Sequence, residues 1–147
     1  MEEFNDYKKK LLVFRDSLPN ELQKFAESEA LTFLNLVKLR TPVDTGNLRN
    51  QWNCKGSVEP DGIDLHITNY SENEVGEQYA SFVEYGHNQH VGQYVPKIGK
   101  RLVKDSVRGV YMMSRSINDI DLEIGKDFTK AIDDLARRCG LTYESNR

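Results

Sequence analysis

The sequence predicts an α+β fold: a long N-terminal helix and a C-terminal helix packed on a small antiparallel β-sheet, with a long mobile loop. Three observations favour this class. Apolar residues recur every three or four positions at both ends of the chain, they alternate with polar residues over 63–68, and no period persists between Gly86 and Arg108. The 147 residues have the length of one ordinary domain, so we expect 1–147 to fold as a single domain.

The first helix is expected over residues 18–40, after a shorter helix or arm at 1–17. Asp16-Ser17 offer side-chain oxygens for an N-cap, and Pro19 would then sit where a missing N–H does no harm. Pro42 disfavours helical geometry at the residue before it, so the helix should end at about residue 40. The apolar stripe consists of Leu18, Leu22, Phe25, Glu29, Phe33, Leu36 and Arg40, widened by Ala26, Ala30, Leu34 and Val37.

A β-hairpin is expected over residues 50–69. Ile63, Leu65 and Ile67 alternate with polar residues, which is the pattern of a half-buried strand. The run Glu-Pro-Asp-Gly at 59–62 supplies residues that favour a turn. The partner strand precedes it and carries Trp52 and Cys54 on one face.

The segment after the hairpin is less regular. Residues 71–78 predict a polar loop, and residues 79–85 fit either a helical turn capped by Gly86 or a short strand, because seven residues are too few to show a period. Residues 87–108 predict a mobile basic loop, since a long segment without a period in a compact domain is usually functional or disordered. Residues 141–147 are expected to form a tail.

The C-terminal helix is expected over residues 117–139, with Gly140 as the residue that ends it. We expect its stripe to share one core with Trp52 and the first helix, so that Phe128→Ala would cost about 3–5 kcal/mol. The stripe comprises Ile117, Ile120, Ile124, Phe128, Ile132, Leu135 and Cys139.

Composition excludes several classes of protein. The 20 Lys and Arg residues against 23 Asp and Glu give a net charge of −3, which argues against a general nucleic-acid binder. The longest apolar runs, at 11–14 and 110–113, have four residues, far too few for a membrane span or a signal peptide. Cys54 and Cys139 are lone thiols. We therefore expect a protein of the reducing cytoplasm.

Charge is distributed unevenly along the middle of the chain. Residues 59–84 carry seven acidic residues and no Lys or Arg, whereas 87–115 carry six basic residues against one acidic. One interpretation is a solvated surface with local salt bridges. The other is self-complementarity, in which the basic loop of one copy meets the acidic face of the next. The residues of this expected subunit interface are Lys97, Lys100, Arg101 and Lys104 on one side, and Glu72, Glu74 and Glu77 on the other.

The sequence gives little support for a catalytic or cofactor-binding site. His87 and His90 are close in sequence, but neither cysteine is near and no third metal ligand stands out. Pro60-Asp61 resembles the opening of a nuclease carboxylate motif, yet no Lys or Arg follows within reach to stabilise the transition state. Ser81 with Glu84 and His87 is a weak candidate triad of common residue types. We therefore expect no enzyme, no cofactor and no metal.

The stretch Thr-Pro-Val-Asp-Thr-Gly-Asn-Leu-Arg at 41–49 predicts a tight corner between helix and sheet. Pro42 ends the helix, Asp44 and Thr45 offer oxygens to nearby backbone N–H groups, and Gly46 permits a positive φ. Each residue fits a good turn by itself. The turn alone does not explain the motif's combination with a long helix before it and Tyr-Ala-Ser-Phe-Val-Glu-Tyr-Gly at 79–86 after it.

This combination resembles the HK97-type phage tail-component family (HK97 gp10-like), the neck proteins of long-tailed phages and prophages, which are related to the minor tail protein Z group of lambda-like phages. The resemblance covers roughly residues 18–139, as a family-like core. Many members begin the last helix with Pro and an aromatic residue, whereas this chain has Tyr-Met-Met at 111–113. The motif residues are Thr41, Pro42, Val43, Asp44, Thr45, Gly46, Leu48, Arg49, Trp52, Asn69, Tyr79, Ala80, Val83, Glu84, Tyr85 and Gly86.

The resemblance implies a structural virion protein of the head–tail junction that completes or joins the tail and assembles as a ring, expected to be a hexamer. Its partners would be itself and other phage neck or tail proteins, with no small-molecule substrate, no membrane and DNA only as passing cargo. It would lie in the host cytoplasm before assembly. Two alternatives stay open: a nucleic-acid-contacting module that uses the basic segment 97–115, and a small prophage-encoded regulator or toxin directed at the host.

Overall fold

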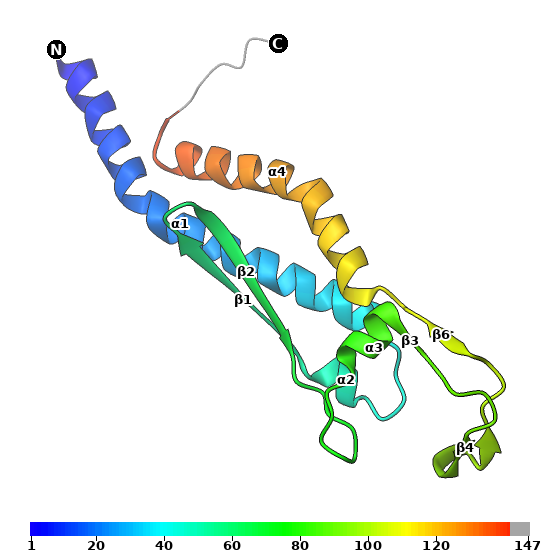
Figure 1. Cartoon of the computed structure of the whole chain (residues 1–147). Coiled ribbons are helices and arrows are strands. Elements are labelled where there is room, and N and C mark those ends of the chain that lie inside the picture. The colour runs from blue at the N-terminus through cyan, green and yellow to red at the C-terminus, as the bar shows by residue number, and fades with distance from the viewer. Residues whose placement is uncertain (142–147) are drawn as a thin grey trace. The chain divides into compact units, whose positions relative to one another are not determined.

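The computed structural model describes residues 1–141, so nearly all of the expected tail at 141–147 lies outside the described residues. The α+β class is confirmed (Figure 1). The elements in chain order are α1 (Glu2–Arg40), α2 (Asn47–Asn50), β1 (Trp52–Glu59), β2 (Gly62–Asn69), α3 (Ala80–Tyr85), β3 (Gly86–Asn88), β4 (Tyr94–Val95), the 3₁₀ turn η1 (Pro96–Ile98), β5 (Lys100–Arg101), β6 (Ser106–Arg108) and α4 (Met112–Arg138). Among the described residues, β1 pairs with β2, and the pairs β3 with β6 and β4 with β5 are antiparallel.

The described chain groups into two compact units. Of the described residues, 1–33, 54–66 and 119–141 belong to the first unit, and 34–53 and 67–118 belong to the second. Each unit has buried apolar side chains of its own. Those of the first are Phe25, Ala26, Ala30, Phe33, Cys54, Ile120 and Leu135, and those of the second are Val37, Leu48, Trp52 and Met112.

The N-terminal helix is longer than expected. A separate element at 1–17 is wrong, because α1 runs without a break from Glu2 to Arg40 and has Pro19 in its interior. Proline removes one backbone donor, but Pro19 and Arg15, whose carbonyl loses that donor, are both exposed, so water can replace the bond. The end at Arg40 is confirmed, two residues before Pro42.

The stripe on α1 buries one carboxyl group in the first unit. Glu29 is 5 % exposed, as its place in the stripe predicts. Its burial, and secondarily the nearby carboxylate of Asp127, raise the pKa of Glu29 above its usual value. The folded state therefore holds this proton more tightly than the unfolded chain does. The contribution of Glu29 to stability consequently becomes less favourable as the pH rises through the folded-state pKa.

The hairpin is confirmed where it was expected. Strands β1 and β2 flank a two-residue turn, Pro60-Asp61, and Trp52 and Cys54 are both buried on one face of β1. Within the first unit, the side-chain amide of Gln23 on α1 donates to the carbonyl of Gly56 at 3.3 Å. Residues 79–85, which fitted a helix or a strand, form helix α3.

The C-terminal helix begins five residues before the expected start at 117. It ends at Arg138, and Gly140 follows with a φ of 73°, as expected of the residue that ends a helix. Phe128 is not a core residue. Its side chain is 39 % exposed, although its ring packs edge-on against Phe25 with the centroids 5.5 Å apart.

This partial exposure lowers the expected cost of truncating Phe128. We expect Phe128→Ala to lower the free energy of unfolding by about 1–2 kcal/mol, well below a full aromatic core truncation, since part of the ring already contacts water. Leu135→Ala, which truncates a buried side chain of the same helix, should cost about 2–4 kcal/mol. Urea unfolding measures both. A larger loss for Phe128→Ala than for Leu135→Ala would contradict this packing.

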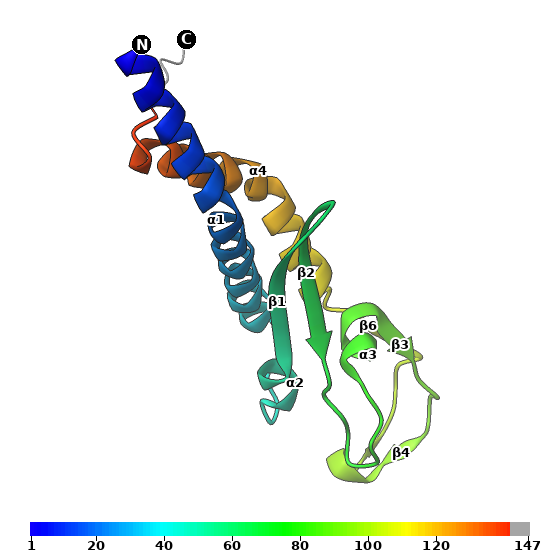
Figure 2. The same ribbon diagram turned by 90° about the vertical axis from the view of Figure 1, so that its left-hand side faces the viewer.

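The basic segment is not structureless. Residues 86–108, here called the arm, form an irregular hairpin with two short ladders, in which Gly86 pairs with Arg108 and Tyr94 with Arg101 (Figure 2). The backbone N–H of Gln89 donates to Asp105, and that of Gly92 donates to Leu102. Each strand spans two or three residues, too few to show alternation in the sequence. The mobility of the arm in an isolated subunit stays a prediction.

Candidate functional site

The corner between α1 and β1 is fixed by a buried threonine. The Thr41 hydroxyl donates to the Val37 carbonyl at 2.6 Å and accepts the indole N–H of Trp52 at 2.9 Å. Both side chains are buried in the second unit. Thr41, the first residue of the motif at 41–49, thereby joins the last turn of α1 to Trp52, the first residue of the hairpin.

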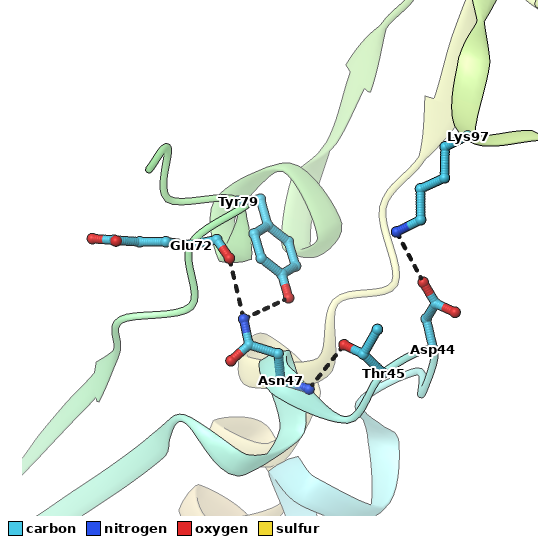
Figure 3. Close-up of polar contacts among 6 residues, drawn as sticks. All are labelled: Asp44, Thr45, Asn47, Glu72, Tyr79 and Lys97. Atoms are coloured by element: carbon cyan, nitrogen blue, oxygen red, sulfur yellow. Dashed lines mark hydrogen bonds and ion pairs between the residues drawn. The ribbon is translucent and has the colours of Figure 1, made fainter. Parts of the chain in front are cut away.

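The tip of the corner turns as the sequence predicts, with one exception. Gly46 has a φ of 86°, and the hydroxyl of Thr45 accepts the backbone N–H of Asn47 at 3.4 Å. Asp44 was expected to accept a backbone N–H as well. Its carboxylate instead lies 3.8 Å from the ammonium of Lys97 on the arm (Figure 3).

Hydrogen bonds to and from α2 connect the motif at 41–49, the motif at 79–86 and the segment between them. The amide of Asn69 donates to the carbonyl of Leu48 at 2.9 Å, and its oxygen accepts the N–H of Ser71 at 3.0 Å. The amide of Asn47 donates to the carbonyl of Glu72 at 3.2 Å and to the hydroxyl of Tyr79 at 3.4 Å (Figure 3). Segments separated by more than twenty residues in the chain therefore meet around one helical turn.

Glu84 has a role that sequence reasoning missed. It was counted among the acidic residues of a surface block, but its side chain is 3 % exposed. Its carboxylate accepts the backbone N–H groups of Met113 at 2.8 Å and Ser114 at 2.9 Å, and the Ser114 hydroxyl at 2.6 Å. A carboxylate suits the N-terminus of a helix, where backbone donors lack partners within the helix. Glu84 therefore caps α4, which explains why this helix starts at Met112.

Close contacts between backbone segments fix the base of the arm. Gly86 ends α3 with a φ of 82°, and a Cβ there would lie 2.3 Å from the carbonyl oxygen of Val107. A Cβ on Gly109 would lie 2.4 Å from the carbonyl oxygen of Glu84. The backbone N–H of Val110 donates to Val83 at 2.9 Å. The chain thus enters and leaves the arm at a point where only glycine fits.

A groove opens over the corner within the second unit. It has a volume of about 660 Å³ and is lined by the corner (42–48), the loop 72–75, Tyr79 and Val83, and Lys97 from the arm. Three carboxylates (Asp44, Glu72 and Glu74) and one ammonium border it. Residues of both sequence motifs therefore line one surface groove.

The residues of the expected subunit interface all lie on the surface of the second unit. Lys97, Lys100, Arg101 and Lys104 are exposed along the arm, and Glu72, Glu74 and Glu77 are exposed on the loop before α3. Of the other acidic residues of 59–84, Glu59, Asp61 and Asp64 belong to the first unit, and Glu84 is buried. Of the remaining motif residues, Ala80 and Val83 are half-buried, whereas Pro42, Val43, Arg49 and Tyr85 are exposed.

The residues considered for chemistry are otherwise engaged or dispersed. The oxygens of Glu84 bind the start of α4, and the ring of His87 packs edge-on against Phe82 at 5.9 Å, so they do not form a triad with Ser81. Within residues 1–141, no three His, Cys, Asp or Glu side chains gather closely enough to hold a metal ion. No helix in the same part of the chain is long and apolar enough to cross a membrane.

Comparison with known protein families gives a match over part of the chain. Residues 2–86 match the family model HK97-gp10_like, described as "Bacteriophage HK97-gp10, putative tail-component". The match begins at the start of α1 rather than at residue 18 and ends at Gly86, so it includes both motifs and leaves out the arm and α4. Neither the curated proteins nor the solved structures gave a significant match. Because the matched residues make up more than half of the chain, the protein belongs to the HK97-gp10-like family of bacteriophage tail components.

Proposed function

We propose that this chain is a non-enzymatic structural subunit of the virion that acts at the head–tail junction and completes or joins the tail. It assembles there as a ring of identical subunits, a hexamer, together with other neck or tail proteins. The family is one of tail components, which supports a structural role. Both the location at the junction and the ring go beyond family membership. The location is what the resemblance to neck proteins of long-tailed phages implies, and the ring is argued from the surface of the second unit.

The observation that carries the proposal is the exposed arm. Four cationic side chains between 97 and 104 extend into solvent, and so do apolar side chains that a lone subunit leaves uncovered. These apolar residues are Val91, Tyr94, Ile98 and Val103, between 54 % and 83 % exposed. A segment that mixes exposed charge with apolar anchors is typical of protein interfaces. The arm therefore suits contact with another protein.

The charges of the second unit supply a partner for the arm. Glu72, Glu74 and Glu77 are exposed on a loop that Asn73 holds in shape, since its side-chain oxygen accepts the backbone N–H groups of Val75 and Glu77. If the arm of one subunit meets this loop on the next, the contact joins two different surfaces. Such heterologous contacts close into a ring when the rotation between subunits allows it. Each exposed pair contributes only about 0–1 kcal/mol, so assembly should be weak in the free protein and stronger on a portal or tail template.

Charge reversal on the arm tests this function. Replacing Lys97, Lys100, Arg101 and Lys104 with Glu should leave the melting temperature nearly unchanged and abolish the joining of tails to heads in vitro. The matched control reverses four exposed cations of the first unit, Lys8, Lys24, Lys55 and Lys130, and should join normally. Normal joining by the arm variant would contradict the proposed role of the arm.

The same variants address the nucleic-acid alternative. Filter binding of duplex DNA at low salt should show no micromolar affinity for the wild-type chain, because its net charge of −3 disfavours phosphate over much of the surface. Micromolar binding with a steep salt dependence, lost in the arm variant, would favour a module that contacts nucleic acid.

A further inference from the structure

The groove and the end of the arm have complementary chemistry. We propose that the groove over the corner binds the arm tip (residues 94–101) of a neighbouring copy of this chain. The inference rests on the proposed ring and deepens it. It assigns the site that receives the arm and identifies apolar side chains, besides charges, as the residues that anchor it.

The groove presents an apolar lining with an acidic border. Pro42, Val43, Leu48, Val75 and Val83 contribute apolar surface, and the border has three carboxylates against one ammonium. A volume of about 660 Å³ is large enough for a few side chains. The groove therefore fits a short segment that carries apolar side chains between positive charges.

The arm tip is a segment of this kind. Tyr94 pairs with Arg101 and Val95 with Lys100, and the turn η1 closes the hairpin, so the backbone of the tip is held in one shape. Ile98 is 57 % exposed at the turn, flanked by Lys97 and Lys100. A preformed hairpin loses less conformational entropy on docking than an unstructured loop.

A subunit does not fill its own groove with its own tip. Lys97 is the one arm residue among those that line the groove, and its ammonium lies 3.8 Å from Asp44 with both side chains more than two-thirds exposed. Tyr94 and Ile98 stay exposed in the same chain. The intrachain contact brings a cation to the border and leaves the apolar lining open to a second copy.

Cysteine cross-linking between two different variants tests this docking. One variant carries Ile98→Cys on the tip and the other Val75→Cys on the groove, each in a Cys139→Ser background. Cys54 can stay, because burial raises the pKa of its thiol and hides it from oxidants. Oxidation of a 1:1 mixture at a concentration that supports association should give a disulfide-linked dimer of the two variants.

A matched control measures the cross-linking yield that random collisions give. Leu122→Cys lies in the first unit, is 74 % exposed, and should cross-link to Ile98→Cys at least tenfold less than Val75→Cys does. Equal yields for Val75→Cys and Leu122→Cys would overturn the docking site. If the charge-reversed arm still abolished tail joining in that case, the proposed function would stand and only the groove would be wrong.

Sedimentation tests separately whether Ile98 is the apolar anchor of the tip. Ile98→Ser should weaken self-association in sedimentation by about tenfold or more, since a buried isoleucine contributes at least that factor to binding. Val103→Ser removes a similar side chain from the arm outside the tip and should change association less than threefold. Equal effects of the two variants would contradict an anchor at the tip.

Discussion

Trp52→Ala is expected to lower the free energy of unfolding by about 3–5 kcal/mol, because it removes a large buried ring from the core of the second unit. The substitution also leaves the buried hydroxyl of Thr41 without the indole N–H that it accepts at 2.9 Å. Urea unfolding followed by circular dichroism measures the loss. A cost of this size would leave the variant close to the limit of folding.

A conservative variant separates the ring from its hydrogen bond. Trp52→Phe keeps most of the apolar surface and removes the N–H, so it should cost about 1–2 kcal/mol. Thr41→Val should cost a similar amount, because it removes the other partner of the same bond and the bond to Val37. A loss below about 1 kcal/mol for Trp52→Ala would mean that the corner is not packed as described.

Removal of the helix cap is expected to have the second-largest effect. Glu84→Ala should cost about 2–4 kcal/mol, because two backbone N–H groups and one hydroxyl at the start of α4 lose a charged acceptor. Protection of the Met113 and Ser114 amides from hydrogen exchange should fall together with the stability.

Two controls identify the cause of this loss. Glu84→Gln keeps one oxygen acceptor and should cost about half as much, whereas Glu77→Ala removes an exposed carboxylate and should stay within about 0.5 kcal/mol of the wild type. Equal stability of the Glu84→Ala and Glu77→Ala variants would show that Glu84 does not cap the helix.

Elements that local rules determine could be predicted from the sequence. Alternation at 63–67 and the turn at 59–62 identify the hairpin, and Pro42 marks the end of the first helix. The continuity of α1 through Pro19 was missed because the rule for proline assumes a lost hydrogen bond, and at an exposed position water can replace it.

Features that depend on distant residues could not be predicted in this way. The start of α4 depends on Glu84, which lies 29 positions before Met113 in the chain. Val110, Tyr111 and Met112 have no side chain that could cap the start of α4. The lack of a local cap indicated that a distant residue must accept the first backbone N–H groups of this helix. The strands of the arm pair over two or three residues, too few for an alternation in the sequence to reveal them.

The candidate site was predicted as a set of residues but not as a surface. Both motifs were found from the sequence, and so was the positive φ of Gly46. Their convergence on one groove was missed, because it depends on Asn47, which bonds to the loop at Glu72 and to Tyr79 through a side chain that no pattern singles out. The acidic surface expected at 59–84 wrongly included Glu84, because the sequence alone does not show that this side chain is buried.

The proposed ring requires that the arm of one subunit bind the loop that carries Glu72, Glu74 and Glu77 on the next, and a charge-swap mixture tests this contact most directly. One variant carries Glu at 97, 100, 101 and 104, and the other carries Lys at 72, 74 and 77. Each variant alone places like charges at every contact and should sediment as a monomer. An equimolar mixture restores opposite charges at every contact between alternating subunits, so sedimentation velocity should show association at the wild-type level. A mixture that stays monomeric where the wild type associates would contradict the account.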